Sequence, residues 1–182
     1  MLRWFPGFAL ALLFATGVAM PASALVIART SPQSSVQAQG STFQVNVYAD
    51  FSVPAGSTGL LGFGLDLAYD HSLITLVTPP QLGPGFTGFT GPDGDGLGGI
   101  AASALPGGTL LLATLSFHAD ALGTSGLVLS VTPGDLTEGF ALDPTGFDTA
   151  QFVNNQVTVV PEPSSFCLLA VALTGMALAR RR

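Results

Sequence analysis

Carboxylate side chains give this 182-residue chain its main capacity for chemistry. The region from Leu25 to Val160 holds ten of them against one cation, Arg29, so its formal charge is −9. The ten acids are Asp50, Asp66, Asp70, Asp93, Asp95, Asp120, Asp135, Glu138, Asp143 and Asp148. Carboxylates that converge can hold Ca²⁺ or act as the acid and base of glycoside hydrolysis. Their spacing therefore decides between a metal site, an enzyme and a charged surface.

The segment Asp93-Gly-Asp95-Gly is the one local carboxylate cluster in a glycine-rich loop. Two aspartates spaced in this way resemble part of a calcium-binding loop. The complete EF-hand pattern needs an oxygen ligand two residues after Asp95 and a glutamate at its twelfth position, where this chain has Leu97 and Ala104. We therefore predict no cofactor, with Ca²⁺ at Asp93 and Asp95 as the alternative to a solvated turn.

Asp66 and Asp70 fall on the same outward side of one predicted strand. Residues four apart in a strand are separated by about 13 Å at Cα, whereas the two carboxyls of a glycosidase lie about 5 to 9.5 Å apart. Asp70 is better explained as the turn residue that follows Tyr69. We predict that the chain is not an enzyme. The alternative is a secreted hydrolase that acts on polysaccharide through its loop carboxylates.

His71 and His118 are the only histidines, and each follows a predicted strand. A metal site would require the two rings to meet in space, and a Ser-His-Asp triad stays open because sequence alone does not exclude it. The chain has no Gly-x-Ser-x-Gly motif, which would mark a nucleophile elbow. We expect both histidines to be surface residues at strand ends.

Phe86 and Phe89 belong to the stretch Phe-Thr-Gly-Phe inside a glycine-rich loop. Exposed aromatic rings on such a loop can stack on a sugar or on a partner protein. The two residues are therefore a candidate ligand contact. In the alternative interpretation, both rings fold back onto the core beneath the loop.

Composition excludes several classes of function. The chain has no lysine, and the acidic central region argues against binding to nucleic acid or to anionic lipid headgroups. Lysine chemistry, including Schiff bases and phosphate-binding lysine loops, is excluded as well. The only cysteine, Cys167, lies outside the central region, which therefore has neither disulfides nor zinc–thiolate sites.

The central region reads as a series of short strands. Period-two alternation, which indicates one buried and one wetter face, recurs along it. The inward positions are predicted at Phe43, Val45, Val47, Phe63, Leu65, Leu67, Tyr69, Leu111, Ala113, Leu115, Phe117, Leu127, Leu129, Val131, Val157 and Val159. Turn-forming runs of Gly, Pro, Asp and Ser separate these stretches. We predict a single all-β domain, an antiparallel β-sandwich over residues 25–160.

The N-terminus has the pattern of a secretory signal peptide, which we assign to residues 1–24. Arg3 supplies the positive charge, Phe5 to Met20 is mainly apolar, and Ala22-Ser-Ala24 is a small-x-small cleavage site. We expect export through the Sec machinery and cleavage before Leu25. A second membrane anchor is the alternative.

The C-terminus combines Pro161-Glu162-Pro163, the apolar run from Phe166 to Ala179, and the cluster Arg180-Arg181-Arg182. Together these three parts resemble the PEP-CTERM sorting signal of Gram-negative bacteria, in which a short transmembrane helix follows the Pro-Glu-Pro motif. The resemblance implies that residues 161–182 enter the inner membrane transiently and are cleaved by an exosortase. It implies delivery to the cell surface or extracellular matrix, in a setting of biofilm and exopolysaccharide. A simple membrane anchor is the alternative.

The central region resembles a cohesin-type domain. Ser41 to Asp50 is similar to its opening strand, Gly62 to Val77 to its next strand pair, and Leu110 to Gly126 to its long strand and tight turn. Phe152 to Val160 resembles the final strand. The resemblance implies a jelly-roll sandwich of about nine strands that binds an extracellular protein or polysaccharide without catalysis, as cohesins bind dockerin modules. Helices of the signal peptide and the sorting tail would flank it.

Overall fold

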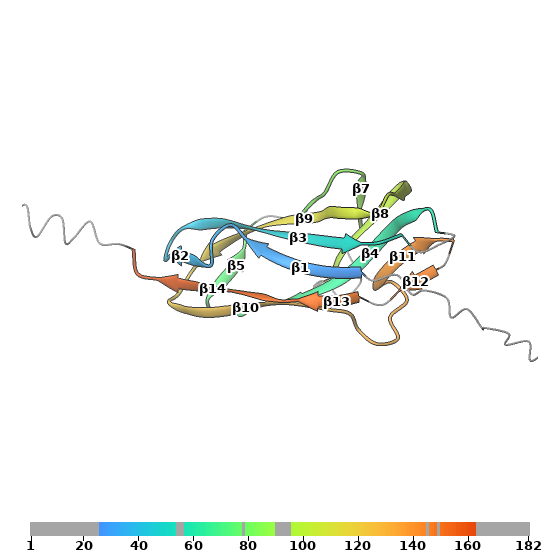
Figure 1. The fold of residues 1–182 in the computed structure, drawn as a ribbon. Coiled ribbons are helices and arrows are strands. Elements are labelled where there is room, and N and C mark those ends of the chain that lie inside the picture. The colour runs from blue at the N-terminus through green and yellow to red at the C-terminus, as the bar shows by residue number, and fades with distance from the viewer. Residues whose placement is uncertain are drawn as a thin grey trace, which may run out of the picture.

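The computed structural model describes residues 26–53, 57–77, 79–89, 96–144, 146–148 and 150–162. These residues form fourteen β-strands and no helix. The strands make two sheets that face each other as a sandwich (Figure 1). The predicted all-β sandwich is therefore confirmed. The strands outnumber the nine expected because several of them are short edge segments.

The first sheet has the strand order β13-β1-β3-β9-β5, and β6 also pairs with β9. Its strands are β1 (Val26–Pro32), β3 (Thr42–Phe51), β5 (Ile74–Leu76), β6 (Gln81–Leu82), β9 (Gly108–Ala119) and β13 (Ala150–Val153). The long β3–β9 pair forms its centre.

The second sheet has the order β12-β11-β4-β10-β14-β2, with β8 and β7 attached beside β4. Its strands are β2 (Val36–Ala38), β4 (Gly59–Ala68), β7 (Phe86–Phe89), β8 (Gly96–Leu105), β10 (Gly123–Ser130), β11 (Gly139–Asp143), β12 (Gly146–Asp148) and β14 (Asn155–Val160). The β11–β12 hairpin and β10 share one edge of β4, and β8 takes the other. This arrangement leaves β4 covered along both edges.

The core lies between the sheets, where the alternating residues point. Phe43, Val45 and Val47 of β3 are buried, as are Leu65 of β4 and Leu127 of β10. The rings of Phe43 and Phe117 stack across β3 and β9 with centroids 5.8 Å apart. Burying such side chains provides the main driving force for folding, at about 25 cal/mol per Å² of apolar surface.

Two sequence predictions about the strands need correction. Leu112 is fully buried, whereas Leu111, predicted to point inward, is partly exposed. The reason is a shift of register in the β3–β9 ladder between Val47 and Tyr48, which exchanges the faces of the neighbouring residues. The sheets are also not wholly antiparallel, because β1 pairs with β13 and β14 with β2 in parallel.

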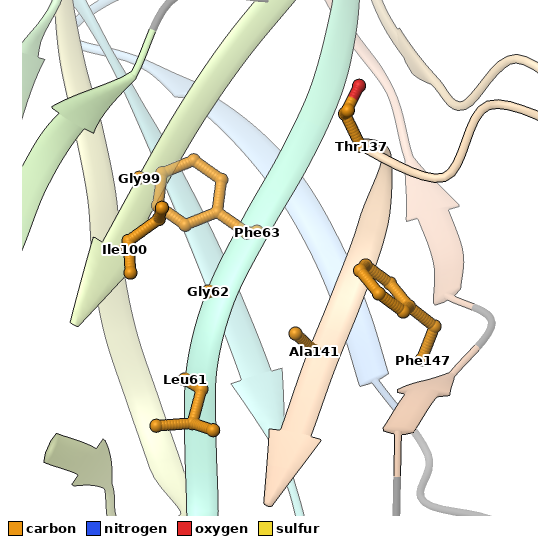
Figure 2. A pocket seen from close by; sticks show the side chains of 8 residues that line it. All are labelled: Leu61, Gly62, Phe63, Gly99, Ile100, Thr137, Ala141 and Phe147. Atoms are coloured by element: carbon orange, nitrogen blue, oxygen red, sulfur yellow. The ribbon is translucent and has the colours of Figure 1, made fainter. Parts of the chain in front are cut away.

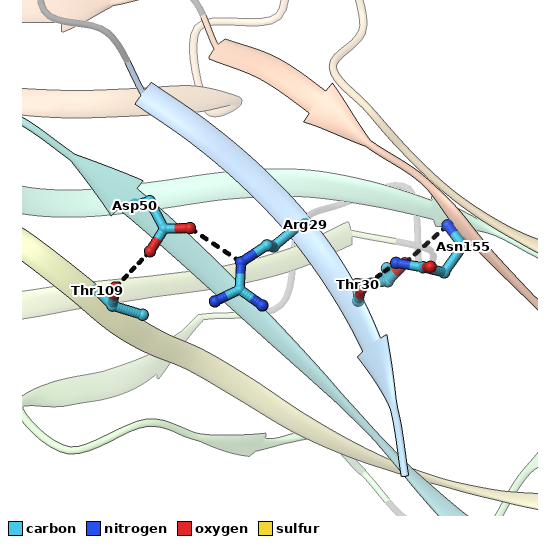
Figure 3. Close-up of polar contacts among 5 residues, drawn as sticks. All are labelled: Arg29, Thr30, Asp50, Thr109 and Asn155. Atoms are coloured by element: carbon cyan, nitrogen blue, oxygen red, sulfur yellow. Dashed lines mark hydrogen bonds and ion pairs between the residues drawn. The ribbon is translucent and has the colours of Figure 1, made fainter. Parts of the chain in front are cut away.

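Thr30 and Asn155 tie the two sheets together (Figure 3). The Thr30 side chain is buried, and its hydroxyl oxygen accepts a hydrogen bond from the backbone N–H of Asn155 at 3.2 Å. The Asn155 amide donates to the Thr30 carbonyl, and the Thr30 hydroxyl donates to the Leu127 carbonyl at 3.4 Å. These bonds join β1 of one sheet to β10 and β14 of the other.

The described chain enters and leaves the sandwich at opposite poles (Figure 1). Val26 of β1 pairs with Phe51, whereas Val160 at the end of β14 pairs with Ala38. The predicted helices of the signal peptide and of the sorting tail lie outside the described residues. Within the described residues, no helix is long and apolar enough to cross a membrane.

Candidate functional site

An apolar groove crosses the outer face of the second sheet, and a single cross-strand row of residues creates it. Gly62 of β4 pairs with Ile100 of β8 on one side and with Ala141 of β11 on the other. Ala141 pairs in turn with Phe147 of β12. Across these four strands, the row therefore has a large side chain at Ile100, none at Gly62, a small one at Ala141 and a large one at Phe147.

Ile100 and Phe147 form the walls of this groove, and Gly62 and Ala141 form its floor (Figure 2). The wall side chains are 55% and 60% exposed, which is high for large apolar residues. The groove holds about 290 Å³. Its other lining residues are Leu61, Phe63, Gly99 and Thr137.

Among the described residues that line the groove, Thr137 is the only one with a polar side chain, and the loop of residues 131–138 brings it there. Its backbone N–H and its hydroxyl both donate to Oδ1 of Asp135, at 2.7 and 2.6 Å. The loop lies directly on β4, since a Cβ added to Gly64 would be 2.0 Å from the Thr137 carbonyl oxygen. A glycine at position 64 is therefore required for this close approach.

Asp66 and Glu138 bring two carboxyls together beneath the same loop. Thr132 connects them, because its backbone N–H donates to Glu138 and its hydroxyl donates to Oδ2 of Asp66 at 3.1 Å. Burial raises the pKa of Glu138, and the Thr132 N–H opposes that rise. The charges of Asp66 and Asp135 raise this pKa further, as does a hydrogen bond with the Asp66 side chain. Glu138 therefore holds its proton more tightly than an ordinary glutamate does.

This pair does not have the geometry of a glycosidase. A hydrogen bond with the Asp66 side chain is one cause of the raised pKa of Glu138, whereas hydrolysis needs two carboxyls about 5 to 9.5 Å apart with substrate between them. Asp70, the other residue weighed for catalysis, belongs to a separate network. Its Oδ1 accepts hydrogen bonds from the N–H and hydroxyl of Ser72, at 2.9 and 2.6 Å. Asp70 is a turn residue, as predicted.

His71 lies in the turn after β4, as expected, whereas His118 is the penultimate residue of β9 rather than a residue that follows the strand. The His71 ring lies 4.1 Å from the Tyr69 ring, and Nε2 of His118 is 3.8 Å from Oδ1 of Asp120. Among the described residues, no group of three or more His, Cys, Asp or Glu side chains is arranged to hold a metal ion. Asp93 and Asp95 lie outside those residues, so calcium at that loop stays a prediction.

Phe86 is part of strand β7 and lies against the core rather than free in a loop. Its ring meets the Phe63 ring edge-on, with centroids 4.9 Å apart. The backbone of Phe89 ends the same strand. This packing of Phe86 favours the alternative in which the ring folds back, and ligand contact through Phe86 and Phe89 stays a prediction.

The outer face of the first sheet carries the only basic residue of the central region. Arg29 bonds to Oδ2 of Asp50 at 2.9 Å, and Thr109 donates to the other oxygen of that carboxylate (Figure 3). The Arg29 guanidinium also lies 4.8 Å from the centre of the Tyr48 ring. The Thr109 hydroxyl and then Arg29 lower the pKa of Asp50. The charge of Arg29 is thus matched within its own sheet.

Comparison with known proteins identifies the two parts of the chain. Residues 159–182 match the PEP-CTERM protein-sorting motif. No curated protein matches the chain in sequence. Among solved structures, a non-cellulosomal cohesin from the archaeon Archaeoglobus fulgidus covers 80% of this chain and 97% of its own, at 19% identity and a TM-score of 0.52.

Two further solved structures have the same fold. A cohesin module from a family 33 glycoside hydrolase of Clostridium perfringens has a TM-score of 0.61 at 7% identity, covering 75% of this chain and 99% of its own. A type I cohesin in a cohesin–dockerin complex from Clostridium thermocellum has a TM-score of 0.51 at 12% identity, covering 74% and 99%. At these identities the likeness establishes the fold.

The chain is a cohesin-like sandwich that ends in a PEP-CTERM sorting motif. The motif indicates an exported protein. The region that matches the motif begins inside the fold, because Val159 and Val160 belong to β14. Of the predicted sorting and cleavage residues, Pro161 and Glu162 are described. The others lie outside the described residues: Pro163, Arg180, Arg181, Arg182, Ala22 and Ala24.

Sequence reasoning did not single out the groove. A glycine at an outward strand position, as at Gly62, is a local signal for a depression in a sheet. The walls, however, depend on which strands pair and in which register. Ile100 is 38 residues from Gly62, and nothing local to either residue fixes that pairing.

Proposed function

We propose that this protein is exported, is sorted by an exosortase through its PEP-CTERM tail, and acts at the cell surface or in the extracellular matrix. There its cohesin-like sandwich serves as a non-catalytic interaction module, in a setting of biofilm and exopolysaccharide. The sorting motif at residues 159–182 supports the first part. The observation that carries the second part is the apolar groove with its exposed walls, Ile100 and Phe147.

The lining of the groove favours a protein partner over a polysaccharide. Sugars are bound through several hydrogen bonds as well as by stacking on aromatic rings. The described lining of the groove offers the Phe147 ring but only one side-chain hydroxyl, that of Thr137. A protein partner can insert an apolar side chain between Ile100 and Phe147, which is how interface anchors fill pockets. Dockerin-like modules are among the partners to be tested.

Sorting is tested by fractionating the native host and measuring the intact mass of the protein. We expect the wild-type protein in the surface or matrix fraction, without residues 1–24 and without its arginine cluster. Replacing Pro161, Glu162 and Pro163 by alanine should leave the tail attached and the protein in the membrane fraction. Replacing Ser164 and Ser165 by alanine is the matched control and should change neither result. A matrix protein that keeps its complete tail would contradict this proposal.

A further inference from the structure

The sorting tail leaves the sandwich with almost no spacer. Val159 is buried, and the Val160 carbonyl accepts a hydrogen bond from the Gln39 N–H at 2.8 Å. The Glu162 side chain lies beside Gly40. Five residues, two of them proline, separate Val160 from the apolar run that begins at Phe166. Fully extended, five residues span at most about 17 Å.

The end of the sandwich from which the tail leaves, the exit pole, consists of β2, the turn at residues 39–41 and the turn at residues 120–122. Hydrogen bonds hold the two turns of the exit pole together. The Gly40 N–H donates to the Ala119 carbonyl, and the Gln39 side chain donates to the Asp120 carbonyl. Two large apolar side chains are exposed here, Val36 at 52% and Leu122 at 50%.

The negative charge of the sandwich limits how it can lie on a membrane. The central region carries a formal charge of −9, and its one arginine is paired with Asp50 on the first sheet. An anionic headgroup surface repels such a body within about a Debye length, which is roughly 8–10 Å. The charged and titratable groups beside the exit pole are Asp70, His71, His118, Asp120 and Glu162. Residues 161–165 hold the sandwich close to the membrane, and its negative charge is repelled there. The favoured orientation is therefore the one in which the sandwich has the least contact area with the membrane.

We propose that the exit pole lies against the lipid headgroups while the tail is attached, so that the sandwich stands upright on the membrane. This inference rests on the proposed function, which places the tail in the bilayer. The groove lies toward the opposite pole, because β4 runs from Leu61 at the groove to Ala68 and then to the turn at Asp70. Seven residues of strand span about 23 Å. The groove is therefore open to a partner before the tail is cleaved.

The orientation is tested on the full-length protein with its tail, reconstituted in liposomes that contain anionic phospholipid and a headgroup-level quencher. Cys167→Ser removes the native thiol, and a dye is attached at Val36→Cys or at Ile100→Cys. The two side chains are matched in exposure, at 52% and 55%. We expect loss of most fluorescence at position 36 and little loss at position 100. Equal quenching at the two positions, or stronger quenching at position 100, would overturn the inference.

A spacer provides the control for the tether. Ten Gly/Ser residues inserted between Val160 and Pro161 add a flexible reach of roughly 16–19 Å, so quenching at position 36 should fall toward that at position 100. Unchanged quenching would show that the tether does not set the orientation. Flotation of the liposomes separates the two proposals: protein that fails to float contradicts membrane insertion of the tail, and the orientation falls with it. If the protein floats but the dye is quenched equally at positions 36 and 100, only the proposed upright orientation is contradicted.

Discussion

Ionisation of Glu138 lowers the stability of the folded protein. Its pKa in the folded protein is raised above the ordinary value of 4.5, so the native state binds this proton more tightly than the unfolded chain does. The resulting stability is fully present below about pH 4.5 and is lost as the pH rises through the raised pKa. Glu138→Gln removes the charge and keeps an acceptor for Thr132. The variant should therefore be more stable than wild type at neutral pH, as measured by urea unfolding between pH 4 and 8.

Asp70 provides a control, because its pKa is shifted in the opposite direction to that of Glu138. The Ser72 hydroxyl, and then the Ser72 N–H, lower the pKa of Asp70. The ionised Asp70 therefore stabilises the fold at a pH above the pKa that it has in the unfolded chain. This stability is lost as the pH falls through the lower pKa that Asp70 has in the folded protein. Asp70→Asn should reduce stability at neutral pH and weaken the loss of stability in acid. If Glu138→Gln also reduces stability at neutral pH, the account of Glu138 is wrong.

Thr30 is the residue on which the connection between the sheets depends. Thr30→Val keeps the shape but removes the hydroxyl that accepts from the Asn155 N–H and donates to the Leu127 carbonyl. A buried polar group that loses its partner costs about 1–3 kcal/mol, so the free energy of unfolding should fall by that amount. Thr30→Ser retains the hydroxyl and should cost much less. Equal losses in the two variants would show that the methyl group matters instead.

The sequence predicted individual residues well where the signal is local. Asp70 is a turn residue because its carboxylate bonds two residues ahead, a contact that its position after Tyr69 already indicates. Leu111 was misplaced because a single shift of register on β3 and β9 changes which side chain points inward. The closeness of Asp66 and Glu138 depends on how a loop folds over a strand 72 residues away, which no local pattern contains.

At the scale of elements, the docking of the 131–138 loop on β4 makes a sharp prediction. Gly64→Ala places a methyl group 2.0 Å from the Thr137 carbonyl oxygen, so the loop must move. Overpacking of this kind costs about 1–3 kcal/mol, and the displaced loop should become sensitive to protease. Gly126→Ala is the matched strand control, because its nearest contact would be a Val128 methyl at 3.5 Å. Equal protease resistance in the two variants would argue against the close contact.

The long strands were predictable, and their partners were only partly so. Alternation in β3 and β10 identifies their buried faces because burial on one side of a sheet imposes a period of two. The parallel pairs at the sheet edges, β1 with β13 and β14 with β2, join segments far apart in sequence. The β11–β12 hairpin was not among the strands predicted from alternation. The groove follows from that hairpin, so its position could not be derived from the alternation alone.

At the scale of the whole molecule, the two proposals place separate tasks at the two ends of the sandwich. The sorting motif continues from β14 at the exit pole, and strands β8, β11 and β12, which line the groove, lie toward the opposite pole (Figure 1). The negative charge of the sandwich favours solubility and is repelled by anionic surfaces. The walls of the groove, Ile100 and Phe147, are exposed apolar residues in the position where a partner protein would bind.

Retention of the purified mature protein by matrix material of the native host tests the central claim most directly. We expect wild type to be retained, retention to disappear when the matrix is treated with protease, and Ile100→Asp to reduce retention at least tenfold, about 1.4 kcal/mol. Val36→Asp, matched in exposure at the other pole, should be retained like wild type. Retention that survives in Ile100→Asp, or that survives protease and disappears when polysaccharide is degraded, would contradict a protein-binding groove.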